Sequence, residues 1–261
     1  MCDRIISFAS IPNARDLGGL TTTRGQRIRR GLLLRSASLC GAAEQDIRAL
    51  ENHYHLKKVI DLRTGMERQE KPDAAVPGAE ICPIPVFDVR MAGISHENRD
   101  FQLSDIPPME ALYRNMVADP DCRKNLGRAA MAVMDQDFSS GAVLWHCTEG
   151  KDRCGLLAAV LLLALEVDQQ TILQDYLLTN VVNGPKAEIY AQKLLASGMP
   201  EGDAEKVRDI FLAREAYLLS TLAEIDRCWQ DRFAFLTQGL GIPEALILSF
   251  RSQVLTGTPI L

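Results

Sequence analysis

Residues 141–165 read GAVLWHCTEGKDRCGLLAAVLLLAL, in which the polar segment 146–155 separates two apolar runs. The first run, 141–145, has the length of a buried strand, and the second, 156–165, has the length of a core helix. This order predicts a strand, a tight loop and a helix. The N-terminus of a helix favours negative charge, because its free backbone N–H groups and its dipole point at one spot. We therefore expect the loop to bind an anion such as a phosphate dianion.

A cysteine and an arginine within this loop indicate its chemistry. Cys147 stands six positions before Arg153, whose planar fork of donors suits two phosphate oxygens. Such surroundings lower a cysteine pKa from about 8.5 to roughly 3.5–7.5, which makes the thiolate the resting form. Gly150 allows a tight turn close to the anion, and His146 is placed to hydrogen-bond the backbone or the thiolate. The pattern predicts phosphate-ester hydrolysis through a phosphocysteine; the alternative is a buried structural cysteine.

The same spacing occurs a second time. Cys122 and Arg128 also stand six residues apart, but the residues before them, Ala118–Asp121, form no apolar strand. The apolar positions that follow have helical spacing, so the pair is expected on the first turns of a helix. We interpret this second match as a coincidence of spacing.

The segment His146–Arg153 resembles the phosphate-binding loop of the bacterial tyrosine and phosphoinositide phosphatases, also called atypical lipid phosphatases, in the cysteine-dependent protein tyrosine phosphatase superfamily. Further segments resemble that family's pattern in order and spacing: Asn13–Gly19, Leu34–Ala37, Val59–Thr64 with Glu67, and the tail 217–242. The resemblance covers most of the chain. It implies a cysteine-dependent phosphatase that surrounds the phosphoryl group with Thr148, Glu149, Gly150, Lys151, Asp152 and Arg153.

Two residues depart from the family's pattern. Cys154 occupies a position where the family usually has Thr or Ser, whose hydroxyl bonds the sulfur and eases breakdown of the phosphoenzyme. A thiol is a weaker donor, so this step is expected to be slower or to need another group. Glu149 stands where a small residue is common, and its carboxylate is expected to soften the positive field of the loop.

The general acid has two candidates. Asp152 lies inside the loop, where the resembling family places its acid, although Asp is also a favoured helix N-cap. Asp88 follows a predicted strand, where other cysteine phosphatases keep their acid on a movable loop. We favour Asp152, with Asp88 as the alternative.

Lys151 bears on substrate choice. At the mouth of the site its ammonium could meet a second phosphate, as on a phosphoinositide headgroup, or it could be a solvated loop lysine. Phosphotyrosine proteins are the first expected substrate and phosphoinositides the second. The alternatives from other classes are a catalytically silent phosphate-binding module and a rhodanese-like sulfur transferase. Asn13, Arg15 and Asp16 either line the cleft or brace it through a buried ion pair; we favour the bracing role.

The whole chain, 1–261, is expected to form one α/β domain with a mostly parallel central sheet flanked by helices. Predicted strands span 32–35, 57–62, 80–86 and 142–146. Predicted helices span 42–53, 108–117, 122–134, 153–165, 169–179, 185–197, 203–237 with a break, and 243–255. The resemblance suggests that a helical insertion at about 180–238 is a lid, with a hinge at Gly198–Gly202. The simpler interpretation is that its aromatic residues only pack the helices together.

Composition excludes several classes. The net charge of −5 argues against a nucleic-acid partner, and the longest apolar run is about half of the ~20 residues that span a bilayer. Seven cysteines without a Cys-x-x-Cys pair argue against a disulfide framework and a zinc site. No metal and no cofactor are expected. The cytoplasm is the default location, although export without a classical signal peptide is open, as is the oligomeric state.

Overall fold

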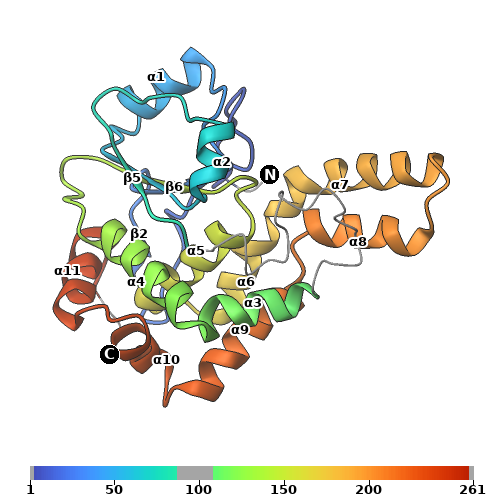
Figure 1. Cartoon of the computed structure of the whole chain (residues 1–261). Helices are drawn as coiled ribbons and strands as arrows, with labels where there is room; N and C mark the ends of the chain where they lie inside the picture. The colour runs from blue at the N-terminus through green and yellow to red at the C-terminus, as the bar shows by residue number, and fades with distance from the viewer. Residues whose placement is uncertain (1–2, 87–107, 259–261) are drawn as a thin grey trace.

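The fold is built around a five-stranded sheet, seen in a computed structural model that describes residues 3–86 and 108–258 (Figure 1). Its strand order is β1-β3-β6-β4-β5, and all neighbouring pairs are parallel except β1 with β3. The strands are β1 (Arg15–Asp16), β3 (Leu33–Ser36), β6 (Val143–His146), β4 (Lys58–Asp61) and β5 (Glu80–Pro83). A separate pair joins β2 (Arg27–Ile28) to β7 (Leu255–Thr256). The predicted α/β class with a mostly parallel sheet is confirmed.

The central strand β6 shows how the sheet buries both faces. Val143 and Trp145 belong to the larger apolar cluster, whereas Leu144 belongs to the smaller one on the opposite face. Successive side chains of a strand point to opposite faces, so a continuous apolar run is what two covered faces require. The smaller cluster lies under α1 (Glu44–Asn52), and the larger one under α4 (Pro120–Met134) and α5 (Asp152–Ala164).

Most of the remaining helices pack against the larger cluster. Ile172 and Tyr176 of α6 (Gln169–Leu177) belong to the larger cluster, and α9 (Glu215–Cys228) packs against α3 (Met109–Ala118). A short α10 (Arg232–Ala234), a π-helix (Phe235–Gly239) and α11 (Glu244–Val254) close the chain. Among the described residues no single helix is long and apolar enough to cross a bilayer. One bent pair of helices, 232–239 with 244–254, has the length and composition of a span, which is weak evidence by itself.

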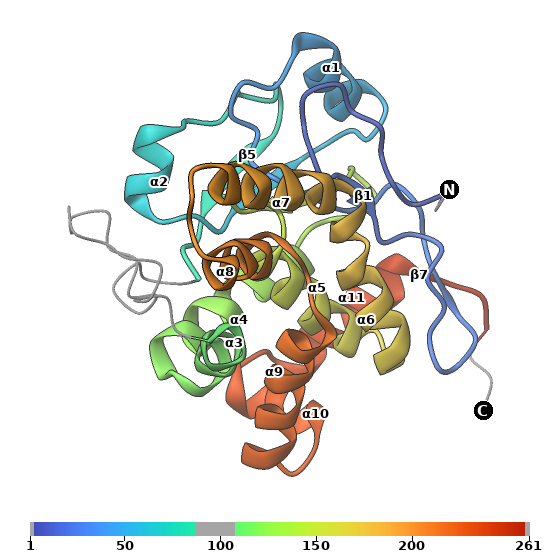
Figure 2. The ribbon, with the colours of Figure 1, turned by 90° about the vertical axis from the view of Figure 1, so that its right-hand side faces the viewer.

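Two antiparallel helices, α7 (Thr179–Ala196) and α8 (Glu201–Phe211), form a hairpin that projects from the body. It extends to the right in Figure 1 and points toward the viewer in Figure 2. Tyr190 of α7 stacks on Phe211 of α8 at 5.2 Å, so these aromatic residues do pack helix on helix. Gly198 lies in the turn at the far tip of the hairpin, with a φ of 85°. A hinge there would move one helix against the other but would not lift the hairpin.

Three predicted elements need correction. The helix expected from Pro185 begins at Thr179, with Pro185 inside it, and the carbonyl that loses a donor belongs to the exposed Val181. The segment 203–237 holds several helices, because the chain is extended at Leu212 and at Trp229. The strand expected over 80–86 ends at Pro83. The helix α2 (Gly65–Glu70) was not predicted.

Candidate active site

The phosphate-binding loop connects the central strand to a buried helix. Cys147 directly follows β6, and α5 begins at Asp152. Gly150 adopts a φ of 68°, and a Cβ on it would lie 2.7 Å from the backbone nitrogen of Ala37. Only glycine fits both the turn and the close approach to the end of β3.

The Cys147 sulfur is set up as a thiolate. A side-chain hydrogen bond from Cys154 lowers the pKa of Cys147 to about 6, and burial, which opposes this, is outweighed by the further help of Arg153 and a backbone N–H. Burial raises the pKa of the Cys154 thiol well above its usual range, and the neighbouring Cys147 raises it further. Cys154 therefore keeps its proton. Its Sγ lies 3.6 Å from the Ser36 carbonyl oxygen, a weak hydrogen bond, and the thiol also acts on the adjacent Cys147 sulfur, at the position where the family's hydroxyl would stand.

Arg153 is held by a carboxylate that we did not single out for this role. Its Nη1 and Nη2 each donate to a carboxylate oxygen of Glu67 at 2.7 Å. Thr148 donates to the same carboxylate at 2.5 Å. Burial alone would raise the pKa of Glu67, but its hydrogen bonds with Arg153 and the arginine's charge hold it far below its usual range. The guanidinium plane is thus fixed by a bidentate pair.

Glu67 is itself positioned by the helix that went unpredicted. In α2 the Thr64 side chain accepts the Glu67 N–H, and the Glu67 carboxylate accepts the Thr64 N–H. This reciprocal capping box has the sequence pattern Thr-x-x-Glu, which was available as a signal in residues 64–67.

Asp152 does not cap α5. Its Oδ1 accepts the hydroxyl of Tyr113 at 2.5 Å, and the Lys151 Nζ lies 3.3 Å from the same oxygen. The N-cap position is held by Lys151, without a side-chain cap bond, so the capping interpretation of Asp152 is wrong. The alternative acid, Asp88, lies outside the described residues.

Lys151 is neither solvated nor at the mouth of the site. Its side chain is 1% exposed, and Nζ donates to the carbonyls of Ile210 at 2.6 Å and Leu212 at 3.2 Å, with that of Asp209 at 3.4 Å. These carbonyls belong to the C-terminal end of α8 and the residue after it. A cation there compensates carbonyls that lack helical partners and complements the helix dipole. Lys151 thus joins the loop to the hairpin.

Glu149 makes a second link to the hairpin. Its carboxylate oxygens each lie 2.7 Å from Nζ of Lys186 in α7. The expectation that Glu149 softens the loop's field needs revision, because its charge is paired with an ammonium. The Glu149 carbonyl accepts the side-chain amide of Asn13 at 3.0 Å.

A buried group of arginines supports the loop from behind. Arg35 donates to the Gly150 carbonyl at 2.9 Å and pairs with Asp175 at 3.0 Å. Arg4 and Arg15 pair with the same carboxylate, at 2.6 and 3.4 Å. Burial raises the pKa of Asp175, but the three guanidinium groups lower it to about 2. Arg15 therefore braces the site through a buried ion pair rather than lining it.

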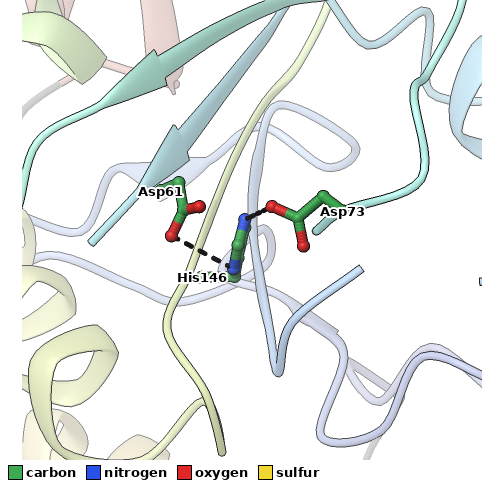
Figure 3. A group of neighbouring side chains, drawn as sticks. All are labelled: Asp61, Asp73 and His146. Carbon is green, nitrogen blue, oxygen red and sulfur yellow. Dashed lines mark ion pairs between the residues drawn. The ribbon is translucent and has the colours of Figure 1, made fainter. Parts of the chain in front are cut away.

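Figure 3 shows His146 between two aspartates beneath the loop. Its Nε2 lies 3.0 Å from Asp73 and its Nδ1 lies 3.9 Å from Asp61, so these groups could together hold a metal ion. Both carboxylates are already paired with Arg63, at 2.8 Å for Asp61 and 2.6 Å for Asp73. A cation would have to compete with that guanidinium, which favours an ion-pair network that fixes His146.

Comparison with known proteins identifies the family. Residues 6–256 match the tyrosine phosphatase family, and the chain belongs to it. A Cupriavidus necator protein named as a tyrosine-protein phosphatase is 32% identical over 254 residues, covering 97% of this chain and 89% of that protein. The triple specificity protein phosphatase PtpB of Mycobacterium tuberculosis is 23% identical over 280 residues, covering 93% and 96%.

One solved structure overlaps more loosely. TpbA of P. aeruginosa in complex with phosphotyrosine shares 16% identity, covers 77% of this chain and 90% of its own, and superposes with a TM-score of 0.29. The family match and the two relatives make this chain a phosphatase of the tyrosine phosphatase family.

Proposed function

We propose that this phosphatase hydrolyses phosphate monoesters through a phosphocysteine intermediate. The Cys147 thiolate attacks phosphorus, and the bond from phosphorus to the ester oxygen breaks. Asp152 gives its proton to the departing oxygen. Water then attacks the phosphocysteine and loses a proton to Asp152, which releases inorganic phosphate and restores the thiolate.

One observation carries this proposal: the buried Cys147 follows β6 in a loop whose Arg153 is held by both oxygens of Glu67 at 2.7 Å, surroundings that lower the pKa of the cysteine to about 6. Because ionisation is favoured once the pH exceeds the pKa, Cys147 is mostly a thiolate at neutral pH and can act as the nucleophile. Arg153 and the loop N–H groups would bind the equatorial oxygens as charge builds up on them. The same features argue against a phosphate-binding module without activity.

We propose phosphotyrosine as the preferred substrate. The phosphoinositide alternative rested on a free ammonium at Lys151, whereas the Lys151 ammonium is engaged by carbonyls of the hairpin. Both relatives have names that place them among protein phosphatases, and the C. necator protein is named for tyrosine. Together these observations support an aryl phosphate on a protein over a multiply charged headgroup.

Release of inorganic phosphate from a panel of substrates tests both parts of the proposal. The panel holds phosphotyrosine, phosphoserine and phosphothreonine peptides and a set of phosphoinositides, offered to wild type and to Cys147→Ser. We expect fastest release from phosphotyrosine peptides and none from the variant. Release of phosphate by Cys147→Ser would refute the phosphocysteine route. Faster release from phosphoinositides than from phosphotyrosine peptides would refute phosphotyrosine as the preferred substrate.

We also propose that the α7–α8 hairpin acts as a lid. The contacts of Lys151 and Glu149 with α8 and α7 support this, because they link the loop directly to the hairpin. Limited proteolysis by trypsin at Arg214, in the connection at the base of the hairpin, with and without orthovanadate as a phosphate analogue, tests it. Equal cleavage in both conditions would count against a moving hairpin.

A further inference from the structure

Tyr113 of α3 is a fully buried residue whose hydroxyl reaches the active site. It donates to Oδ1 of Asp152 at 2.5 Å, and its oxygen lies 2.6 Å from the hydroxyl of Tyr176 in α6. Burial raises the pKa of Tyr113 well above its usual range, and the charge of Asp152 raises it further. The hydroxyl therefore keeps its proton and stays a donor.

The arrangement fits both protonation states of the carboxyl group. When Asp152 is ionised, Tyr113 donates to it, and Tyr176 can donate to the Tyr113 oxygen. When Asp152 carries a proton, a hydroxyl can accept from the acid and donate onward to Tyr176 instead. A general acid that later serves as a base passes through both states in each turnover.

The two oxygens of Asp152 differ in their surroundings. Oδ1 is engaged by Tyr113 and lies 3.3 Å from the Lys151 ammonium. Within residues 3–86 and 108–258, Oδ2 has no hydrogen-bond partner, and the side chain is 30% exposed. The carboxyl is thus held at one oxygen and open at the other.

We propose that Tyr113 is a positioning residue, supported by Tyr176, that holds Oδ1 of Asp152 so that Oδ2 meets the leaving oxygen of the substrate. This inference rests on the proposed role of Asp152 as the acid. Tyr113 of α3 and Tyr176 of α6 thus act on proton transfer without touching the phosphoryl group.

Packing alone would not require the hydroxyl. The Tyr113 ring packs against the rings of Tyr176 at 6.0 Å and Tyr217 at 5.6 Å, contacts that phenylalanine could also make. A buried hydroxyl is favourable only when it is hydrogen-bonded, and this one is directed at a carboxyl group. Tyr217 provides the matched control, because its hydroxyl lies 3.5 Å from the Asp209 carbonyl and not at Asp152.

The test compares aryl phosphates whose phenols differ in acidity, with dinitrophenyl phosphate at one end and phenyl phosphate at the other. A poor leaving group needs the acid and a good one does not. The quantity measured is kcat/KM, which reports the attack by Cys147 and not the later hydrolysis of the phosphoenzyme. The variants are Tyr113→Phe, Tyr176→Phe, Tyr217→Phe and Asp152→Asn.

We expect Asp152→Asn to lose about a hundredfold or more on phenyl phosphate and little on dinitrophenyl phosphate. Tyr113→Phe should lose about tenfold on phenyl phosphate alone, and Tyr176→Phe less, with the same dependence. Tyr217→Phe should follow wild type. A merely structural loss would be equal for all leaving groups and would overturn the inference.

Two outcomes separate this inference from the proposal beneath it. If the loss of kcat/KM in Asp152→Asn is the same for every leaving group, the acid is another residue, and both the role of Asp152 and that of Tyr113 are refuted. If the loss in Asp152→Asn depends strongly on the leaving group while Tyr113→Phe shows the same dependence as wild type, only the role of Tyr113 is refuted. Should Tyr113→Phe not fold, Tyr176→Phe decides: a loss relative to wild type that is the same for every leaving group would refute the hydrogen-bonded chain.

Discussion

The chain contains two cysteines that each precede an arginine by six residues, and although both are buried, they lie in different backbone settings. Cys147 ends the central strand, and a carboxylate locks Arg153 beside it. Cys122 lies inside the first turn of α4, where its backbone N–H is capped by Asp119. Arg128 donates to Asn125 on the exposed side of the same helix.

The difference lies in the backbone between the two residues. A helix turns about 100° per residue, so six positions separate two side chains by about 1.7 turns, which places them on different faces and spreads them along the axis. A loop that curls around an anion brings the same two side chains to one centre. The spacing indicates a phosphate-binding loop only when a strand precedes the cysteine and a helix begins next to the arginine.

Removal of each sulfur gives the largest contrast. We expect Cys147→Ser to abolish release of phosphate from aryl phosphates, because no thiolate remains to attack phosphorus. Cys122→Ala should stay within about twofold of wild type, since a small apolar residue fits that helix. Steady-state assays of both variants check this, and comparable losses would erase the contrast between the two segments.

Exchange of each arginine for lysine gives the next largest effect. Arg153→Lys keeps the charge but loses the bidentate fork, and we expect kcat to fall by roughly 10²–10³. Arg128→Lys should leave kcat unchanged. Steady-state kinetics of the two variants test this. A loss of kcat of less than about tenfold in Arg153→Lys would mean that a positive charge, without the bidentate fork, is enough for catalysis.

The support of Arg153 by Glu67 is expected to contribute less. Glu67→Gln keeps the capping box but weakens the bond to the guanidinium, and we expect kcat/KM to fall by about tenfold. Glu70→Gln, on the same short helix, serves as the control. Equal activity of wild type and Glu67→Gln would mean that Arg153 does not depend on this carboxylate.

The smallest effect concerns ionisation of Cys147. Its pKa of about 6 predicts that the rate of alkylation by iodoacetamide rises through pH 6, because only the thiolate reacts. Cys154→Ala removes the first cause of that low pKa, so the midpoint should move to higher pH. Cys154→Ser keeps a donor and should hold the midpoint low. An identical midpoint in Cys154→Ala would exclude the thiol as the cause.

Local patterns explain what could be predicted. The strand, loop and helix around Cys147 follow from one continuous segment, and the coincidental match at Cys122 was recognised from the same kind of pattern. The Thr-x-x-Glu pattern at Thr64 was equally local and would have identified α2 and the placement of Glu67.

Contacts between distant segments explain what could not be predicted. Nothing near Lys151 in the sequence indicates that carbonyls at 210 and 212 bind its ammonium. The approach of Tyr113 and Tyr176 to Asp152 depends on how α3 and α6 pack, which periodicity does not specify. The start of α7 was also not predictable, because proline favours the first turn of a helix, whereas Pro185 lies inside α7.

The binding of Lys151 to the last carbonyls of α8 also restricts how the hairpin can change in evolution. Residues added or lost at the tip, around Gly198, leave the far end of α8 where it is. One residue added just before Asp209 would rotate the following carbonyls, among them those of Ile210 and Leu212, by about 100° and turn them away from the ammonium. Insertions should therefore be tolerated at the tip of the hairpin and selected against at its base.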